Sequence, residues 1–233
     1  MIPHSLVTRL RFFWKEYLRP LAVLALILAP LRSSLADWNW VPTGSMKPTI
    51  LEGDMVLVNK LAYDLKVPFT LNRLAEWADP KVGDIVVLFS PADEVRLVKR
   101  VVAGPGDTIA MRQNTLILNG KPLPYRLESA EPFAYDIHED AAPIVARETL
   151  PGEREHWVMS LPSRAMPRSF PPIAVPDGQY FVMGDSRDNS ADSRVFGFVE
   201  RRRIVGRAEA VLVSMDKNHH YLPRLGRWAS DLE

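Results

Sequence analysis

Cysteine is absent from this sequence of 233 residues. Its absence excludes a disulfide-stapled scaffold, a thiolate zinc site and a cysteine nucleophile. An excess of charge of one sign is also absent, since 29 lysines and arginines balance 28 aspartates and glutamates. Nucleic acid is therefore not expected as a partner, because no basic field gathers it. Apolar residues amount to 47%, which excludes a wholly disordered chain.

Long apolar runs are absent except for residues 20–31, which carry no charge. A bilayer-spanning helix needs about 20 apolar residues. Aromatic residues before the run and residues 33–36 after it extend the helix to that length, while the Arg32 side chain reaches the membrane surface. Basic residues precede the run: Arg9, Arg11, Lys15 and Arg19. This bias predicts a cytoplasmic N-terminus and an extracytoplasmic remainder. We expect residues 1–36 to form a basic segment and a single membrane anchor; a buried soluble helix and a signal peptide cleaved after Ala36 are the alternatives.

Proline is in excess, with 20 residues, and it interrupts long helices. Beyond Trp40, short apolar runs alternate with turn signals, which predicts a mainly β fold, with an antiparallel, barrel-like domain behind the membrane helix. The expected strands are 54–59, 85–89, 95–102, 115–118, 179–183 and 208–215, with Asn119-Gly120 as a hairpin turn and 71–77 as a short helix. The expected domain comprises 37–123 and 176–216, with 124–175 as an inserted irregular β lobe and 217–233 as a C-terminal tail.

Lys99 lies in one of these expected strands. Period-two alternation places it on one face with Val95, Leu97 and Val101, which are all apolar. A lysine on such a face is desolvated, which lowers its pKa and allows it to act as a general base near neutral pH. The alternative is an edge lysine whose ammonium group reaches solvent.

Ser45 lies in a loop of unusual composition, PTGSMKPT at residues 42–49. Gly44 permits a tight turn and the two prolines stiffen the loop, so the serine hydroxyl projects from a fixed backbone. Such a hydroxyl suits a nucleophile, although an ordinary polar turn has the same composition. None of the five histidines presents itself as a base, so a serine nucleophile here requires a lysine.

Residues 184–194, GDSRDNSADSR, are dense in turn-forming side chains. Their aspartates miss the alternate-residue spacing of a calcium loop, so no metal is expected. A rigid, hydrogen-bonded loop with an Asp–Arg pair is the better interpretation, and it leaves Ser190 available to orient another group.

These three segments together resemble bacterial signal peptidase I, the leader peptidase with a serine–lysine dyad. The likeness follows the chain in order, from the apolar anchor through PTGSMKPT, GDIVVLF, RLVKRVVAGPGD and the Asn119-Gly120 hairpin to QYFVMGDSRDNSADSRVFGFV. Each piece is weak or moderate alone, but the ordered set is highly specific. The resemblance implies a mostly antiparallel β architecture that needs no metal or cofactor.

The resemblance also implies roles for individual residues. The family's nucleophile matches Ser45 and its general base matches Lys99. The family's oxyanion hole uses the N–H of the nucleophile and a hydroxyl two residues earlier, here Thr43, where many members have serine. The serine that holds the lysine amine matches Ser190. Two further positions match a supporting ion pair: Asp192 and Arg194.

The family's small-residue pockets imply a further set of substrate-binding positions: Val41, Met46, Ile50 and Val98. Val98 has the opposite strand parity to Lys99, so a β-bulge is expected if both residues line one cleft.

The function implied is that of a membrane-bound serine endopeptidase that removes N-terminal signal peptides from exported preproteins, cutting after small-x-small residues. Its partners are then preprotein signal peptides and the lipid bilayer, and its location is the bacterial cytoplasmic (inner) membrane, crossed once. Three alternatives are a specialised relative that processes a conjugation or pilus precursor, a soluble self-cleaving repressor and a catalytically dead adaptor. The anchor disfavours the second, and the retained Ser45, Lys99 and Ser190 disfavour the third.

Overall fold

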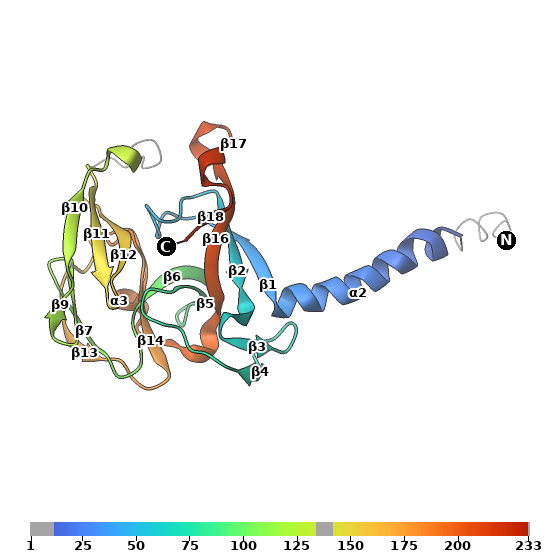
Figure 1. Ribbon diagram of the computed structural model, residues 1–233, viewed down its shortest axis with the longest axis horizontal. Coiled ribbons are helices and arrows are strands. Elements are labelled where there is room, and N and C mark those ends of the chain that lie inside the picture. Colours follow the sequence, from blue (N-terminus) through green and yellow to red (C-terminus); the bar gives the residue numbers. More distant parts are fainter. Residues whose placement is uncertain (1–11, 134–141, 233) are drawn as a thin grey trace.

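Short strands joined by tight turns dominate the computed structural model, which describes residues 12–133 and 142–232. The largest sheet contains β1 (Ala36–Trp40), β2 (Asp54–Asn59), β5 (Ile85–Phe89), β6 (Arg96–Ala103), β14 (Gln179–Met183), β15 (Val199–Glu200), β16 (Ile204–Asp216), β17 (Leu222–Pro223) and β18 (Ser230–Asp231). Its order is β1-β2-β16-β5-β6-β14-β15, and β17 and β18 also pair with β16. All of these pairings are antiparallel, and the sheet curls into a half-barrel (Figure 1). The expected mainly β, barrel-like architecture is confirmed.

Two smaller sheets lie beside the curled sheet, on the left of Figure 1. The four-stranded sheet contains β13 (Phe170–Ala174), β7 (Thr108–Arg112), β8 (Thr115–Leu118) and β9 (Lys121–Pro122), and the three-stranded sheet contains β10 (Tyr125–Glu128), β11 (Ile144–Leu150) and β12 (Arg154–Ser160). Within the inserted segment the described residues are more regular than expected. The two prolines of β13 are tolerated because β13 is an edge strand that pairs only with β7, and its register shifts between Phe170 and Ile173.

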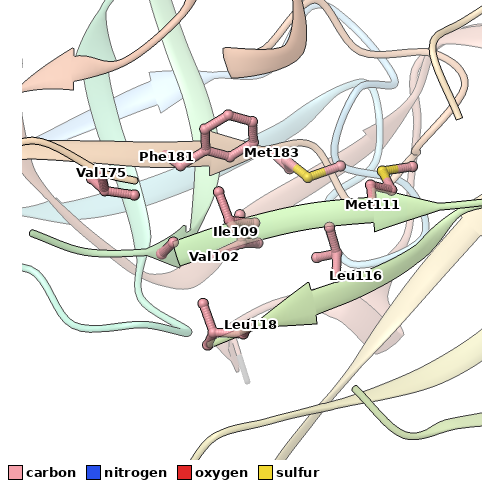
Figure 2. Close-up of a cluster of buried hydrophobic side chains, with 9 residues drawn as sticks. Val102, Ile109, Met111, Leu116, Leu118, Val175, Phe181 and Met183 are labelled. Atoms are coloured by element: carbon pink, nitrogen blue, oxygen red, sulfur yellow. The ribbon is translucent and has the colours of Figure 1, made fainter. Parts of the chain in front are cut away.

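A buried apolar cluster joins the four-stranded sheet to β6 and β14. Figure 2 shows its side chains converging from these elements: Val102, Ile109, Met111, Leu116, Leu118, Val175, Phe181 and Met183. Burying this much apolar surface is the main favourable term for packing two sheets together. The cluster therefore fixes the C-terminal half of β6, the strand that carries Lys99.

Residues 71–77 do not form the expected short helix. Instead β3 (Asp64–Lys66) pairs antiparallel with β4 (Arg73–Glu76) in a separate hairpin. A helix of seven residues is marginal without tertiary packing, whereas the strand gains backbone partners in β3. Trp77 follows β4, and its indole N–H donates to the carbonyl of Leu61 at 3.0 Å.

The N-terminal helix extends away from the sheets (Figure 1). A π-helical turn, Trp14–Leu18, leads directly into α2 (Arg19–Ser34). Together they form one helix of 21 residues, long and apolar enough by composition to cross a membrane. The predicted basic residues Arg9 and Arg11 lie outside the described residues.

Short helical segments complete the described structure: α3 (Ser193–Phe196) and the single turns Lys60–Ala62, Glu131–Phe133, Arg201–Arg203, Lys217–His219 and Leu225–Arg227. The segment expected as a C-terminal tail is built into the sheet through β17 and β18. It also contacts the Ser45 loop, since the Arg227 guanidinium donates to the Thr49 carbonyl at 2.9 Å and to Asp54 at 2.7 Å.

Candidate active site

Apolar side chains on both sides of Ser45 hold its loop in place. Met46 and Ile50 are fully buried, and they belong to one cluster with Val41 and Val56. The loop closes on itself through the N–H of Ile50, which donates to the Met46 carbonyl at 2.9 Å. Ser45 itself is only half-buried, so a fixed backbone presents an accessible hydroxyl.

Lys99 reaches this hydroxyl from β6. Its Nζ lies 2.7 Å from Ser45 Oγ and also donates to the Val98 carbonyl at 3.1 Å, and the residue is only 2% exposed. Burial lowers the pKa of Lys99 to about 8, although the negative charges of Asp192 and Asp185 oppose the change. A lysine with this pKa is partly neutral near physiological pH, and only the neutral amine can accept a proton from the serine.

Val98 and Lys99 occupy a regular stretch of β6. Val98 pairs with Val87 and Lys99 with Val86 of β5, so the β-bulge expected between them is not formed on this side of the strand. The register shift of β6 lies further along, opposite Phe181 and Val182 of β14. Val98 nevertheless packs against the cluster that contains Met46, because the curled sheet brings that cluster over β6. The assignment of Val98 to a substrate pocket stays a prediction.

Gly184 brings the 184–190 segment into direct contact with the Ser45 loop. The N–H of Ser186 donates to the Ser45 carbonyl at 3.1 Å. Ser190 packs on the same glycine, and its buried hydroxyl has no hydrogen-bond partner among the residues that the structure describes. Ser190 is therefore beside the serine loop, and its role in orienting Lys99 stays a prediction.

Asp192 and Arg194 form a buried, two-pronged ion pair behind this segment. Arg194 Nε and Nη2 each lie 2.8 Å from a different carboxylate oxygen of Asp192. Asp192 also accepts a hydrogen bond from the N–H of Gly184 at 3.0 Å, and Arg194 donates to the Arg187 carbonyl at 2.5 Å. The pair thus holds the backbone on both sides of Ser186, at Gly184 and at Arg187, and both charges act on the pKa of Lys99.

A second buried ion pair was not anticipated from the sequence. Arg100 donates to Asp185 through Nε at 2.9 Å and through Nη2 at 2.8 Å. Asp185 also accepts a 2.6 Å hydrogen bond from the Thr49 hydroxyl. Burial raises the pKa of Asp185, but Arg100 outweighs that effect, so the pKa lies below its ordinary value. The available signal was Arg100 itself, because a buried arginine in a valine-rich strand requires a carboxylate partner.

Thr43, two residues before Ser45, is exposed. No cluster of potential metal ligands occurs in the described ranges, 12–133 and 142–232. Two of the histidines considered as bases, His4 and His138, lie outside those ranges. His156 is buried 4.0 Å from Asp185, and His219 contacts Asp216 near the C-terminus. The groups that contact Ser45 are the Lys99 amine at its hydroxyl and the Ser186 N–H at its carbonyl, and a serine paired with a lysine suits acyl transfer.

A family model described as "Signal peptidase, peptidase S26" matches residues 14–213. The chain belongs to this signal peptidase family. Signal peptidase I of Pseudomonas fluorescens is 37% identical over 227 residues, which cover 91% of this chain and 77% of the relative. The enzyme of Pseudomonas aeruginosa is 35% identical over 225 residues with the same coverage, and that of Aquifex aeolicus is 34% identical over 222 residues, covering 83% and 81%.

A crystal structure of signal peptidase I from Enterococcus faecalis V583 is also similar. It shares 27% sequence identity, with a TM-score of 0.34, over 55% of this chain and 96% of that chain. Membership of the signal peptidase family makes the chain a serine endopeptidase of the class that removes signal peptides. The helix at 14–34 fits a single-pass membrane protein of that family.

Proposed function

We propose that this chain is a membrane-bound signal peptidase in which Ser45 is the nucleophile and Lys99 the general base. The observation that carries the proposal is the 2.7 Å distance between Ser45 Oγ and the buried Lys99 Nζ. Nucleophile and base within hydrogen-bond reach are the mark of an activated serine. The lowered pKa of Lys99, about 8, supports the role of base.

In the acylation step, neutral Lys99 accepts the Ser45 proton while Oγ bonds to the scissile carbonyl carbon. The carbonyl oxygen becomes an oxyanion, which the Ser45 N–H and the Thr43 hydroxyl stabilise. Removing one such donor typically slows catalysis about 100–1,000-fold. The tetrahedral intermediate then collapses, the peptide C–N bond breaks, and protonated Lys99 delivers its proton to the leaving amine.

In the deacylation step, Lys99 is neutral again and accepts a proton from water. The resulting hydroxide adds to the acyl carbon, and the ester bond to Ser45 breaks. The proton on Lys99 returns to Ser45 Oγ, which restores the enzyme, and the signal peptide leaves as a carboxylic acid that loses its proton to solvent. The serine orienting the amine in both steps is proposed to be Ser190, supported by Asp192 and Arg194.

The proposed substrate is the signal peptide of an exported preprotein, cut after a small-x-small sequence. Branched and bulky apolar residues pack in one cluster around the Ser45 loop, and we propose that they form the floor of its substrate pockets: Val41, Met46, Ile50 and Val98. A pocket with such walls favours small side chains, because larger ones meet close-packed neighbours.

Membrane placement follows from the helix at 14–34, which we propose as the anchor of residues 1–36 in the bacterial cytoplasmic membrane. Trp38 and Trp40 follow it with 46% and 55% exposure, as is typical of an aromatic belt at the interface. The N-terminus is then cytoplasmic. The catalytic part (37–123 and 176–216), the inserted lobe (124–175) and the C-terminal segment (217–233) are extracytoplasmic.

The decisive experiment incubates the full chain, purified in detergent, with several unrelated preproteins. Wild type should release mature proteins at the small-x-small site, and Ser45→Ala should not. Ser163→Ala, an exposed serine outside the site, is the matched control and should behave as wild type. Cleavage by Ser45→Ala contradicts the proposal, and cleavage of only one preprotein favours the alternative of a specialised conjugation or pilus peptidase.

A further inference from the structure

A closed group of buried polar side chains joins the inserted lobe to the segment behind Ser45. Glu148 of β11 and Arg187 are 0% and 1% exposed. Arg187 Nη2 donates to Glu148 Oε1 at 2.7 Å, and Nη1 donates to the Tyr125 hydroxyl at 3.4 Å. That hydroxyl in turn donates to Glu148. His156 of β12 also faces the carboxylate, with Nε2 3.3 Å from Oε1.

The backbone of the 184–190 segment is also hydrogen-bonded to the lobe. The N–H of Met159 in β12 donates to the Asp185 carbonyl, and the N–H of Arg187 donates to the Met159 carbonyl, both at 2.8 Å. Ser186 lies between these two bonds, and its own N–H points the other way, to the Ser45 carbonyl at 3.1 Å. A continuous route of contacts therefore runs from Glu148 through Arg187 and Ser186 to Ser45.

The charges of this group are fixed at neutral pH. Burial raises the pKa of Glu148, but Arg187 and His156 outweigh it and hold that pKa well below its ordinary value. Burial lowers the pKa of His156, so its ring is neutral at pH 7. A buried ion pair is no better for stability than apolar residues of similar volume. What it adds is a fixed orientation of the two side chains relative to each other.

We propose that Glu148 and Arg187 are positioning residues for the Ser45 nucleophile, acting through the Ser186 N–H. This inference rests on Ser45 being the nucleophile, as proposed above. A displacement of the nucleophile by about 1 Å can cost up to about 100-fold in rate. Neither residue belongs to the apolar cluster of Val41, Met46 and Ile50, so substrate affinity should not depend on the pair.

The test replaces the pair by apolar residues of similar size, Glu148→Leu together with Arg187→Met, in the full chain in detergent. We expect a folded protein whose Tm stays within a few degrees, a kcat about 10–100-fold lower and an unchanged KM. Hydrogen exchange of peptides covering 184–190 should be faster than in wild type, which reports the loosened segment without any activity readout.

The matched control is Arg126→Ala. Arg126 pairs with Glu155 across the same lobe at 3.3 Å, but their side chains are 64% and 41% exposed. Kinetics and exchange should match wild type, because exposed pairs contribute little. The wild-type protein and Ser45→Ala are assayed in parallel. If the proposed function is wrong, these two proteins will cleave preproteins equally, which distinguishes that failure from failure of the positioning role.

A second variant, Arg187→Lys, keeps the charge but removes the fork that reaches both Glu148 and Tyr125. We expect a several-fold lower kcat with Tm and KM unchanged, and this result decides the matter if the double variant does not fold. An unchanged kcat in a folded double variant, or in Arg187→Lys, overturns the proposal. A fall in kcat that merely follows a fall in Tm overturns it as well, since the pair then serves stability alone.

Discussion

Gly184 and Ser45 are in such close contact that a single methyl group cannot be placed between them. A Cβ on Gly184 would lie 2.3 Å from the Ser45 carbonyl oxygen and 2.3 Å from Ser190 Oγ. The glycine is thus required for space and not for an unusual backbone conformation. It allows the 184–190 segment to approach the serine loop closely enough for the Ser186–Ser45 hydrogen bond.

The first prediction is that Gly184→Ala lowers kcat at least about 100-fold, because it displaces the nucleophile loop, Ser190 or both. Preprotein cleavage by the purified full chain measures it, with thermal unfolding recorded in parallel. Gly226→Ala is the matched control, since a Cβ there meets nothing within 4 Å. Near-normal turnover by Gly184→Ala would show that the close contact has no catalytic consequence.

The second prediction concerns the identity of the base. Lys99→Ala and Lys99→Arg should both lose cleavage entirely, the latter because a guanidinium cannot release its proton near neutral pH. The double variant Ser45→Ala with Lys99→Ala should be no worse than either single variant, since the two groups act as a unit. Substantial turnover by Lys99→Arg excludes lysine as the base.

The third prediction is a pH profile. Because the pKa of Lys99 is lowered to about 8, activity should rise with pH through that value and level off above it. A free lysine would instead place the rise near about 10.4. Initial rates between pH 6 and 10 on one preprotein distinguish the two curves, and a rise centred near the free-lysine value contradicts the burial argument.

The fourth prediction is that Lys99→Met makes the protein more stable at pH 7. Both the folded and unfolded forms of wild type carry the Lys99 proton below about pH 8, so the folded state bears the cost of a buried ammonium group, up to about 3 kcal/mol. Between pH 8 and about 10.4 the unfolded state binds the proton more strongly, so wild-type stability rises with pH. The difference in free energy of unfolding between Lys99→Met and wild type therefore closes. Chemical unfolding at pH 7 and pH 10 checks both parts. A variant less stable than wild type at pH 7 refutes the prediction.

The fifth prediction is that the anchor stays attached in the membrane. Ala36 begins β1 and pairs with Asn59 of β2, so the bond after Ala36 is part of the sheet and cannot reach the protein's own cleft. Intact mass of protein extracted from membranes should include residues 1–36, with or without the initiator methionine. A dominant species beginning at Asp37 contradicts this, and its slow appearance in detergent, absent from Ser45→Ala, indicates self-cleavage.

Local patterns in the sequence predicted much of the fold. The Asn119-Gly120 turn has φ angles of 52° and 77°, as its composition indicated, and β8 and β9 pair across it. The strand around Lys99 was also predicted, but alternation left a buried and an edge lysine both open, and the tertiary packing around β6 selects the buried one. The turn and the strand depend on neighbours in the chain, which the sequence displays directly.

Other features depend on distant partners and were not predicted. Residues 71–77 have a pattern compatible with a helix, and only pairing with β3 selects the strand. Arg100 is buried with Asp185, which is 85 positions away, and no local pattern identifies that partner. The link from the lobe to the serine loop through the 184–190 segment is likewise a property of tertiary packing.

The junction between α2 and the sheets contains no hinge. Lys60 donates to the Ser33 carbonyl at 2.9 Å, the Ser33 hydroxyl accepts from the N–H of Phe69 at 2.6 Å, and β1 starts two residues after the helix ends. With the helix fixed across a bilayer, the reaction centre would stand at a constant height above the lipid. Such a protein selects the bond to be cut by its distance from the membrane. Only a bond at a set number of residues from the point where the substrate leaves the membrane would reach the centre. The length of that stretch would then determine cleavage as strictly as its side chains do.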